Sequence, residues 1–92
     1  MAVYVKDPDA VLDYGFDWEE EGFLQTGETI ADSDWTIPDG LDESSGTDFD
    51  NTLTTVWLSG GTDGEDYTVS NHITTSAGRE DIRSHVIKVR SR

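Results

Sequence analysis

The chain has 92 residues, of which 20 are acidic and only 6 are Lys or Arg, so its formal net charge is −14. A charge of this sign disfavours binding to DNA, RNA or an anionic membrane. The absence of cysteine excludes a disulfide framework and a thiolate metal site. The length predicts a single domain over residues 1–92 with one modest core.

The N-terminal residues 1–6 lack the basic region and apolar stretch of a signal peptide, and no apolar run is long enough for a transmembrane helix. We therefore expect the chain to act in the cytoplasm where it is made, or in an assembly built there. Segment 13–19 alternates acids with aromatic residues and places Tyr14, Phe16 and Trp18 on one face, which predicts a half-buried strand. The neighbouring segments 7–13 and 19–27 each fit a helical turn.

Further along the chain, residues 28–37 predict a strand, then a bulge or turn, then a second short strand. Residues 38–40 form a turn, and the polar segment 41–51 predicts an exposed loop or an irregular edge. Segments 52–58, 67–75 and 82–90 carry the β-branched and aromatic residues of strands. The last of these places His85, Ile87 and Val89 on one face. Together these segments predict an all-β fold: a small antiparallel, immunoglobulin-like β-sandwich of about six or seven strands.

The glycine-rich segment 60–66 invites a phosphate or calcium interpretation. It lacks the lysine of a phosphate-binding loop, and its resemblance to a calcium-binding β-helix repeat is inexact and occurs once. We predict a hairpin bend in which glycines adopt positive φ values and acids keep the tip soluble. A second acidic cluster is interpreted as a solvated loop, although its oxygens are of the kind that bind calcium: Asp39, Asp42, Glu43, Asp48 and Asp50.

No residue pattern predicts catalysis, a cofactor or a metal centre. His72 and His85 lie thirteen residues apart without cysteine partners, so each is interpreted as a surface or strand-edge histidine. Ser84 and His85 are adjacent on a strand, so their side chains point to opposite faces and cannot form a catalytic pair.

The basic residues gather near the C-terminus. Residues 67–92 carry a net charge of +3, whereas residues 1–66 carry −17. Four of the basic residues are candidates for a protein interface with an acidic surface, including that of a second copy: Arg79, Arg83, Lys88 and Arg90. The alternative is that they are charges that protect an edge strand from pairing.

One pattern of short segments runs from Lys6 to Arg90, and its most specific part is the Gly60–Val69 stretch followed by Ile73–Arg79. The pattern also includes these segments: Lys6–Ala10, Leu12–Tyr14, Asp17–Trp18, Glu28–Ile30, Trp35–Ile37 and Val56–Gly61. In this pattern the chain resembles the phage fibre-to-tail adaptor family. The run Glu19–Gly22 departs from the pattern, because an apolar segment is expected there.

This resemblance implies a non-enzymatic virion component that docks on other phage structural proteins or on copies of itself. The net charge adds the expectation of no nucleic acid or membrane partner. Two alternatives remain. One is an acidic mimic of DNA that inhibits a host protein, although the basic last strand interrupts the acidic surface. The other is a calcium-stabilised carbohydrate-binding sandwich that uses Trp18, Trp35 or Trp57, although strand-like alternation predicts all three in the core.

Overall fold

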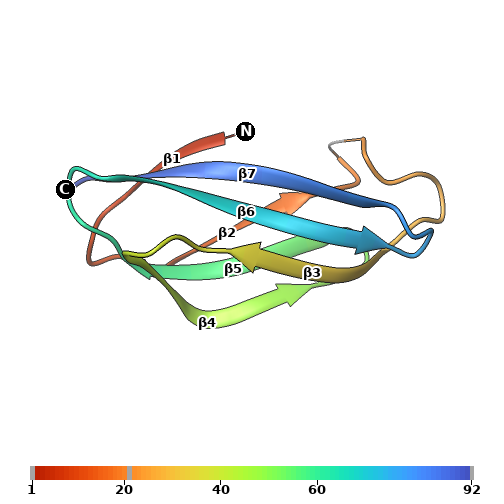
Figure 1. The fold of residues 1–92 in the computed structure, drawn as a ribbon, viewed down its shortest axis with the longest axis horizontal. Helices are drawn as coiled ribbons and strands as arrows, with labels where there is room; N and C mark the ends of the chain where they lie inside the picture. The colour runs from red at the N-terminus through yellow and green to blue at the C-terminus, as the bar shows by residue number, and fades with distance from the viewer. Residues whose placement is uncertain (1, 21, 92) are drawn as a thin grey trace.

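The computed structural model describes residues 2–20 and 22–91, except for the side chain of Ser45. These residues contain β-strands and no helix, so the all-β prediction is confirmed (Figure 1). The strands are β1 (Ala2–Lys6), β2 (Leu12–Asp17), β3 (Ile30–Thr36), β4 (Leu41–Phe49), β5 (Leu53–Gly60), β6 (Asp66–Thr75) and β7 (Glu80–Val89). No helix in this part of the chain has the length and apolar character needed to cross a bilayer.

The strands form two sheets that stack as an elongated sandwich (Figure 1). One sheet has the order β1-β7-β6-β3 and the other β2-β5-β4. Both orders agree with those of immunoglobulin-type sandwiches, except that the first strand joins the sheet of the last one. The β1–β7 pair is parallel, so the prediction of a purely antiparallel fold is wrong there. After β1 the chain crosses to the other sheet, so β1 and β7 are far apart in the sequence. The two strands can therefore pair in parallel, without the tight turn that joins an antiparallel hairpin.

The core lies between the sheets and consists of two clusters. The larger contains Tyr14, Leu41, Val56, Leu58, Val69, Ile87 and Val89. The smaller contains Phe16, Trp18, Ile30 and Ile73. Along β2, β6 and β7 the buried residues alternate with more exposed ones, as a half-buried strand requires.

A buried hydrogen-bond network joins the two sheets at the smaller cluster. Trp18 Nε1 donates to Asn71 Oδ1 at 3.1 Å and to Thr54 Oγ1 at 3.3 Å, and Thr54 Oγ1 donates to Asn71 Oδ1 at 2.7 Å. Asn71 Nδ2 in turn donates to Ser33 Oγ and to the Asp34 carbonyl on β3. These partners offset the desolvation of the polar groups, and they align β6 with β5 in the opposite sheet.

Two segments differ from the sequence predictions. Residues 30–36 form one strand, β3, with a bulge between Ile30 and Asp32, so the bulge is confirmed and the second short strand is wrong. Residues 41–49 form the edge strand β4, as the irregular-edge interpretation predicts, and not a loop. An edge strand keeps one side in water, and a polar, acidic sequence is therefore compatible with it.

The glycine-rich segment is a bend, but it does not close a hairpin. It leads from β5 in one sheet to β6 in the other, and Gly60, Gly61 and Gly64 have φ values of 76°, 96° and 92°. The Tyr67 hydroxyl accepts a hydrogen bond from the Thr62 backbone N–H at 3.0 Å. This is the tyrosine corner found where immunoglobulin-type chains change sheets. The alternation of residue types along the sequence identifies both flanking strands, but it does not show that they belong to different sheets.

The described residues of segments 7–13 and 19–27 do not form the helical turns expected from the sequence. In the first, the Ala10 N–H donates to the Asp7 carbonyl at 3.0 Å in a tight turn, and residues 12 and 13 already belong to β2. In the second, the Gly22 N–H donates to the Glu19 carbonyl at 3.0 Å, and residue 21 lies outside the described residues. Apart from residues 12 and 13, the described parts of both segments are therefore turns and loops.

Candidate interaction surfaces

The four basic residues proposed as an interface do not form one surface. Arg83 lies on the inward side of β7 with the core residues. Lys88 lies on the outward side of the strand, as predicted. Arg79 precedes β7 and Arg90 follows it, so they lie at opposite ends of a strand that is roughly 30 Å long at the usual rise per residue.

Arg79 holds the loop between β2 and β3 against the β6–β7 turn. Its Nε donates to Glu28 Oε2 at 2.9 Å, and its Nη2 donates to Glu28 Oε1 and to the Phe23 carbonyl, both at 2.6 Å. The guanidinium also lies 4.3 Å from the centre of the Phe23 ring. These hydrogen bonds, with one from Thr75, lower the pKa of the Glu28 carboxyl to about 2. Arg79 therefore has a structural role in the folded chain.

The other basic side chains also contact groups of the same chain. Arg90 Nη2 lies 2.8 Å from Asp66 Oδ1, and Lys88 Nζ lies 4.0 Å from Asp66 Oδ2. Arg83 Nε lies 3.7 Å from Asp81 Oδ2, and its guanidinium lies 5.0 Å from the Trp18 ring centre. The interpretation of these charges as protection for an edge strand is wrong, because β7 pairs with β1 on one side and β6 on the other.

The two histidines have different environments. His85 is buried, so its prediction as a surface residue is wrong. Its ring stacks on Phe16 with centroids 3.8 Å apart, and Nε2 donates to the Gly15 carbonyl at 2.8 Å. His72 is half-exposed, and its Nε2 lies 2.8 Å from Glu80 Oε1. Among residues 2–20 and 22–91, no three His, Asp or Glu side chains are grouped so as to hold a metal ion.

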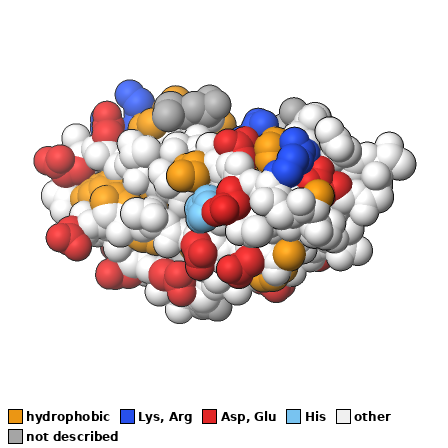
Figure 2. Space-filling view, turned by 45° about the vertical axis from the view of Figure 1, so that its right-hand side comes forward, with side chains coloured by type: hydrophobic (Ala, Val, Ile, Leu, Met, Phe, Trp, Pro, Cys, Tyr) orange, Lys and Arg blue, Asp and Glu red, His pale blue; other side chains and the backbone are white. Residues whose placement is uncertain are grey.

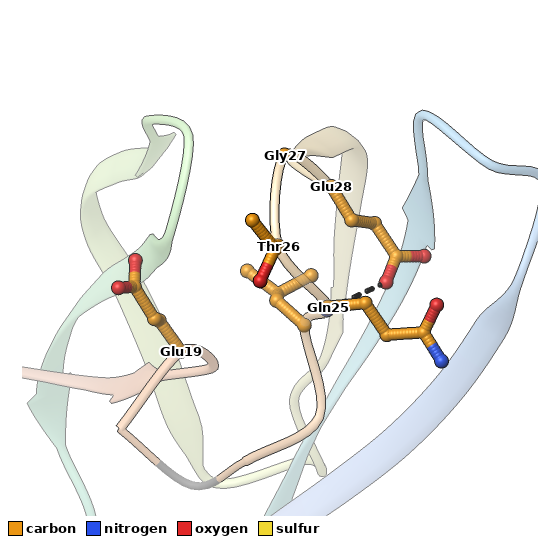
Figure 3. Close-up of a pocket in the computed structure, with 6 residues that line it drawn as sticks. Glu19, Gln25, Thr26, Gly27 and Glu28 are labelled. Carbon is orange, nitrogen blue, oxygen red and sulfur yellow. Dashed lines mark hydrogen bonds between the residues drawn. The ribbon is translucent and has the colours of Figure 1, made fainter.

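A hollow of about 250 Å³ lies in the loop between β2 and β3 (Figure 3). Glu19 and Glu28 lie on opposite sides of it, and Glu28 Oε1 accepts the Gln25 backbone N–H at 3.0 Å. Because Arg79 and Thr75 also bind the Glu28 carboxylate, this group is committed to holding the loop. Of the described residues that line the hollow, Glu28 is therefore engaged in the fold and does not form an acid–base pair with Glu19.

The four edge strands differ in charge. β2, β3 and β4 each carry two or more carboxylates, whereas β1, with the sequence AVYVK, carries none. Lys6, its last residue, is buried, and its ammonium donates to the Asp7 and Gly60 carbonyls. Val3 and Val5 are 56% and 43% exposed. β1 is therefore the edge strand with the least protection against pairing with another chain.

The outer face beside β1 is also low in charge. Val3, Val86 and Thr68 form one row across β1, β7 and β6, and Ser84, Ser70 and Thr36 form the next row across β7, β6 and β3. Ser70 and Ser84 are joined by a hydrogen bond of 2.8 Å between their hydroxyls. We call these two rows the uncharged rows. Elsewhere acidic side chains are spread over much of the molecule, as Figure 2 shows for one face.

Sequence reasoning missed two features of these surfaces. β1 was not predicted as a strand, and Trp57 is 39% exposed on the outer face of β5, so its prediction as a core residue is wrong. Trp18 is buried as predicted, and Trp35 packs partly buried against both core clusters. Residues 53–58 contain apolar side chains on both faces, and alternation alone does not show which face is inward.

The described part of the chain is a small β-sandwich in which the edge strand β1 carries no carboxylate and the adjoining outer face carries the two uncharged rows. The family model of the podophage GP4 fiber-tail adaptor protein gp77 matches residues 6–88, and the chain therefore belongs to this family. A search of the curated proteins finds no match. Family membership confirms the resemblance seen in the sequence and supports a structural role in a phage tail, as a virion component that contacts other tail proteins.

Proposed function

We propose that the chain joins a phage tail by docking the β1 edge and the adjoining uncharged rows on another tail protein. Protein interfaces are depleted of charged residues at their centre, and the uncharged rows are such a region in a chain of net charge −14. An extended segment of a partner that pairs with β1 would extend the β1-β7-β6-β3 sheet. The chain acts by binding, without a catalytic step.

The observation that carries this proposal is the position of Val3. It lies on the one edge strand without a carboxylate and is in register with Val86, at the end of an uncharged row. A charge at Val3 would face the partner in the complex and water in the free chain. The substitution should therefore affect binding more than folding.

The test compares Val3→Lys with Ile82→Lys. Ile82 is 61% exposed on the same outer face, but its neighbours across the sheet are His72 and Asp34, outside the uncharged rows. Each purified variant is mixed with tail particles that lack the chain, and the bound fraction is measured by sedimentation. We expect Val3→Lys to bind about tenfold more weakly, and Ile82→Lys to bind like the wild type.

The thermal unfolding midpoint of each variant shows whether it is folded. Equal binding by the wild type and a folded Val3→Lys variant would overturn the proposed surface. Equal losses in both variants would also contradict it, because they would show a general effect of added positive charge. The bound fraction of the wild-type chain tests the adaptor role itself, because that role requires the chain to bind the tail particles.

A further inference from the structure

The outer face of the β2-β5-β4 sheet carries an exposed aromatic side chain at its centre. The even-numbered residues Thr54, Val56 and Leu58 of β5 are buried, whereas Leu53 and Trp57 are 42% and 39% exposed. β5 is the central strand, with β2 on one side and β4 on the other. A solvated face of an antiparallel sheet normally carries polar residues, so two large apolar side chains here need an explanation.

The neighbouring strands leave Trp57 open. On β4, three residues, 44–46, lie opposite this one position, because the register shifts between Glu43 and Thr47. Gly46, in this irregular segment, has a φ of 88° and no side chain. On β2, Gly15 lies opposite Thr55, next to the Trp57 pair. Irregular strand segments of this kind often lie beside binding sites.

Carboxylates surround the apolar side chains. Asp13 is in register with Trp57 and Asp17 with Leu53, so these four side chains share the outer face. Asp42 and Asp48 lie on the same face from β4, opposite Ser59 and Thr55. None of the three strands contains a Lys, Arg or His residue. The face therefore combines negative charge with exposed apolar surface and has no cation of its own.

The described part of a second copy offers no uncommitted basic side chain, which favours a cation from a different protein. The basic side chains that the structure describes already contact groups of their own chain: Lys6, Arg79, Arg83, Lys88 and Arg90. A second copy would have to break these contacts to supply a cation. Arginine fits the face better than lysine, because a guanidinium can stack on an indole ring and bind a carboxylate through two parallel hydrogen bonds.

We propose that the outer face of the β2-β5-β4 sheet binds an arginine-bearing surface of a second protein. Trp57 receives a guanidinium on its ring, and Asp13 and Asp17 bind the arginine side chains. This face lies on the side of the sandwich opposite the uncharged rows, so the chain can hold two partners at once. That bridging role rests on the proposed function, whereas the arginine site does not.

The test uses two synthetic peptides of equal length, one alternating arginine with serine and the other lysine with serine. Binding is measured by titration calorimetry at low salt, a readout that does not depend on Trp57. We expect the arginine peptide to bind several-fold more tightly than the lysine peptide. Trp57→Thr should abolish that preference, and the double variant Asp13→Asn with Asp17→Asn should weaken arginine-peptide binding about tenfold.

The matched control is Asp32→Asn with Asp34→Asn, which removes the same charge from exposed positions on β3 in the other sheet. We expect it to bind the arginine peptide within about twofold of the wild type. Equal affinity for the two peptides, or equal losses in the two double variants, would overturn the proposal, because either result indicates attraction by net charge alone. Val3→Lys should leave peptide binding unchanged, so the two proposals can fail separately.

Discussion

Trp18 and Asn71 hold the two sheets together through a hydrogen bond of 3.1 Å from the indole Nε1 to the amide Oδ1. The two residues are separated by 53 positions in sequence, and both side chains are buried. Asn71 occupies the middle of β6, where its amide also donates to Ser33 and to the Asp34 carbonyl. A chain without cysteine thus uses a polar network to join the two sheets, which antibody domains join with a disulfide.

This network predicts that Asn71→Leu destabilises the fold by about 1–3 kcal/mol, because Trp18 Nε1 and Ser33 lose a buried partner. The free energy of unfolding is measured by urea titration with circular dichroism. Asn51→Leu is the control, since Asn51 is exposed and lies in the turn before β5. We expect the control to change stability by less than about 0.5 kcal/mol. Similar losses in both variants would contradict a special role for the network.

The Glu28–Arg79 contact predicts a dependence of stability on pH. The pKa of Glu28 is about 2 in the folded chain, against an ordinary value of 4.5. Between these values the unfolded chain binds the proton more readily, so this contribution to stability is complete above pH 4.5 and is lost as the pH falls toward 2.

Glu28→Gln should therefore be less stable than the wild type near neutral pH, and the difference should shrink as the pH falls toward 2. Unfolding midpoints in urea at a series of pH values measure this difference. Glu20→Gln, at an exposed position in the same loop, is the control and should follow the wild type. A difference between Glu28→Gln and the wild type that stays constant with pH would be inconsistent with the ion pair.

The tyrosine corner predicts that Tyr67→Phe lowers stability by about 1 kcal/mol, because the Thr62 N–H loses its acceptor. The phenyl ring still covers Gly40, where an added Cβ would lie only 2.8 Å from the Tyr67 ring. The expected fall in the thermal midpoint is about 4–8 °C. Tyr4→Phe serves for comparison, since Tyr4 is partly exposed on β1. An unchanged midpoint for Tyr67→Phe would show that this hydrogen bond contributes nothing.

The bend between β5 and β6 predicts no dependence on calcium. Asp63 Oδ1 accepts the Ser91 N–H at 2.8 Å, and the substitution Asp63→Asn retains an amide oxygen that can accept the same hydrogen bond. Asp66 is left unchanged because it pairs with Arg90. The double variant Asp63→Asn with Glu65→Gln should have the same thermal midpoint in calcium as in a chelator, as should the wild type. A wild-type midpoint that rises in calcium, and no longer rises in the variant, would show that the bend binds the ion.

The sequence by itself determined the fold class and the inward faces of several strands. Tyr14, Phe16 and Trp18 share one face, as do Ile87 and Val89, and all five are buried as their spacing predicts. This succeeds because the alternation of side chains along a strand is a local property of the backbone. The family resemblance was also recognisable in the residues, and the match over residues 6–88 confirms it.

Only the tertiary structure decided which strands are neighbours and which partners the polar groups have. Local alternation does not show that the chain changes sheets between β5 and β6, or that β1 pairs with β7 and leaves the latter in the middle of its sheet. Glu28 and Arg79 meet across 51 positions, and Trp57 faces outward although both faces of β5 carry apolar residues. Pairing between distant segments depends on the packing of the whole chain, and short-range periodicity carries no information about it.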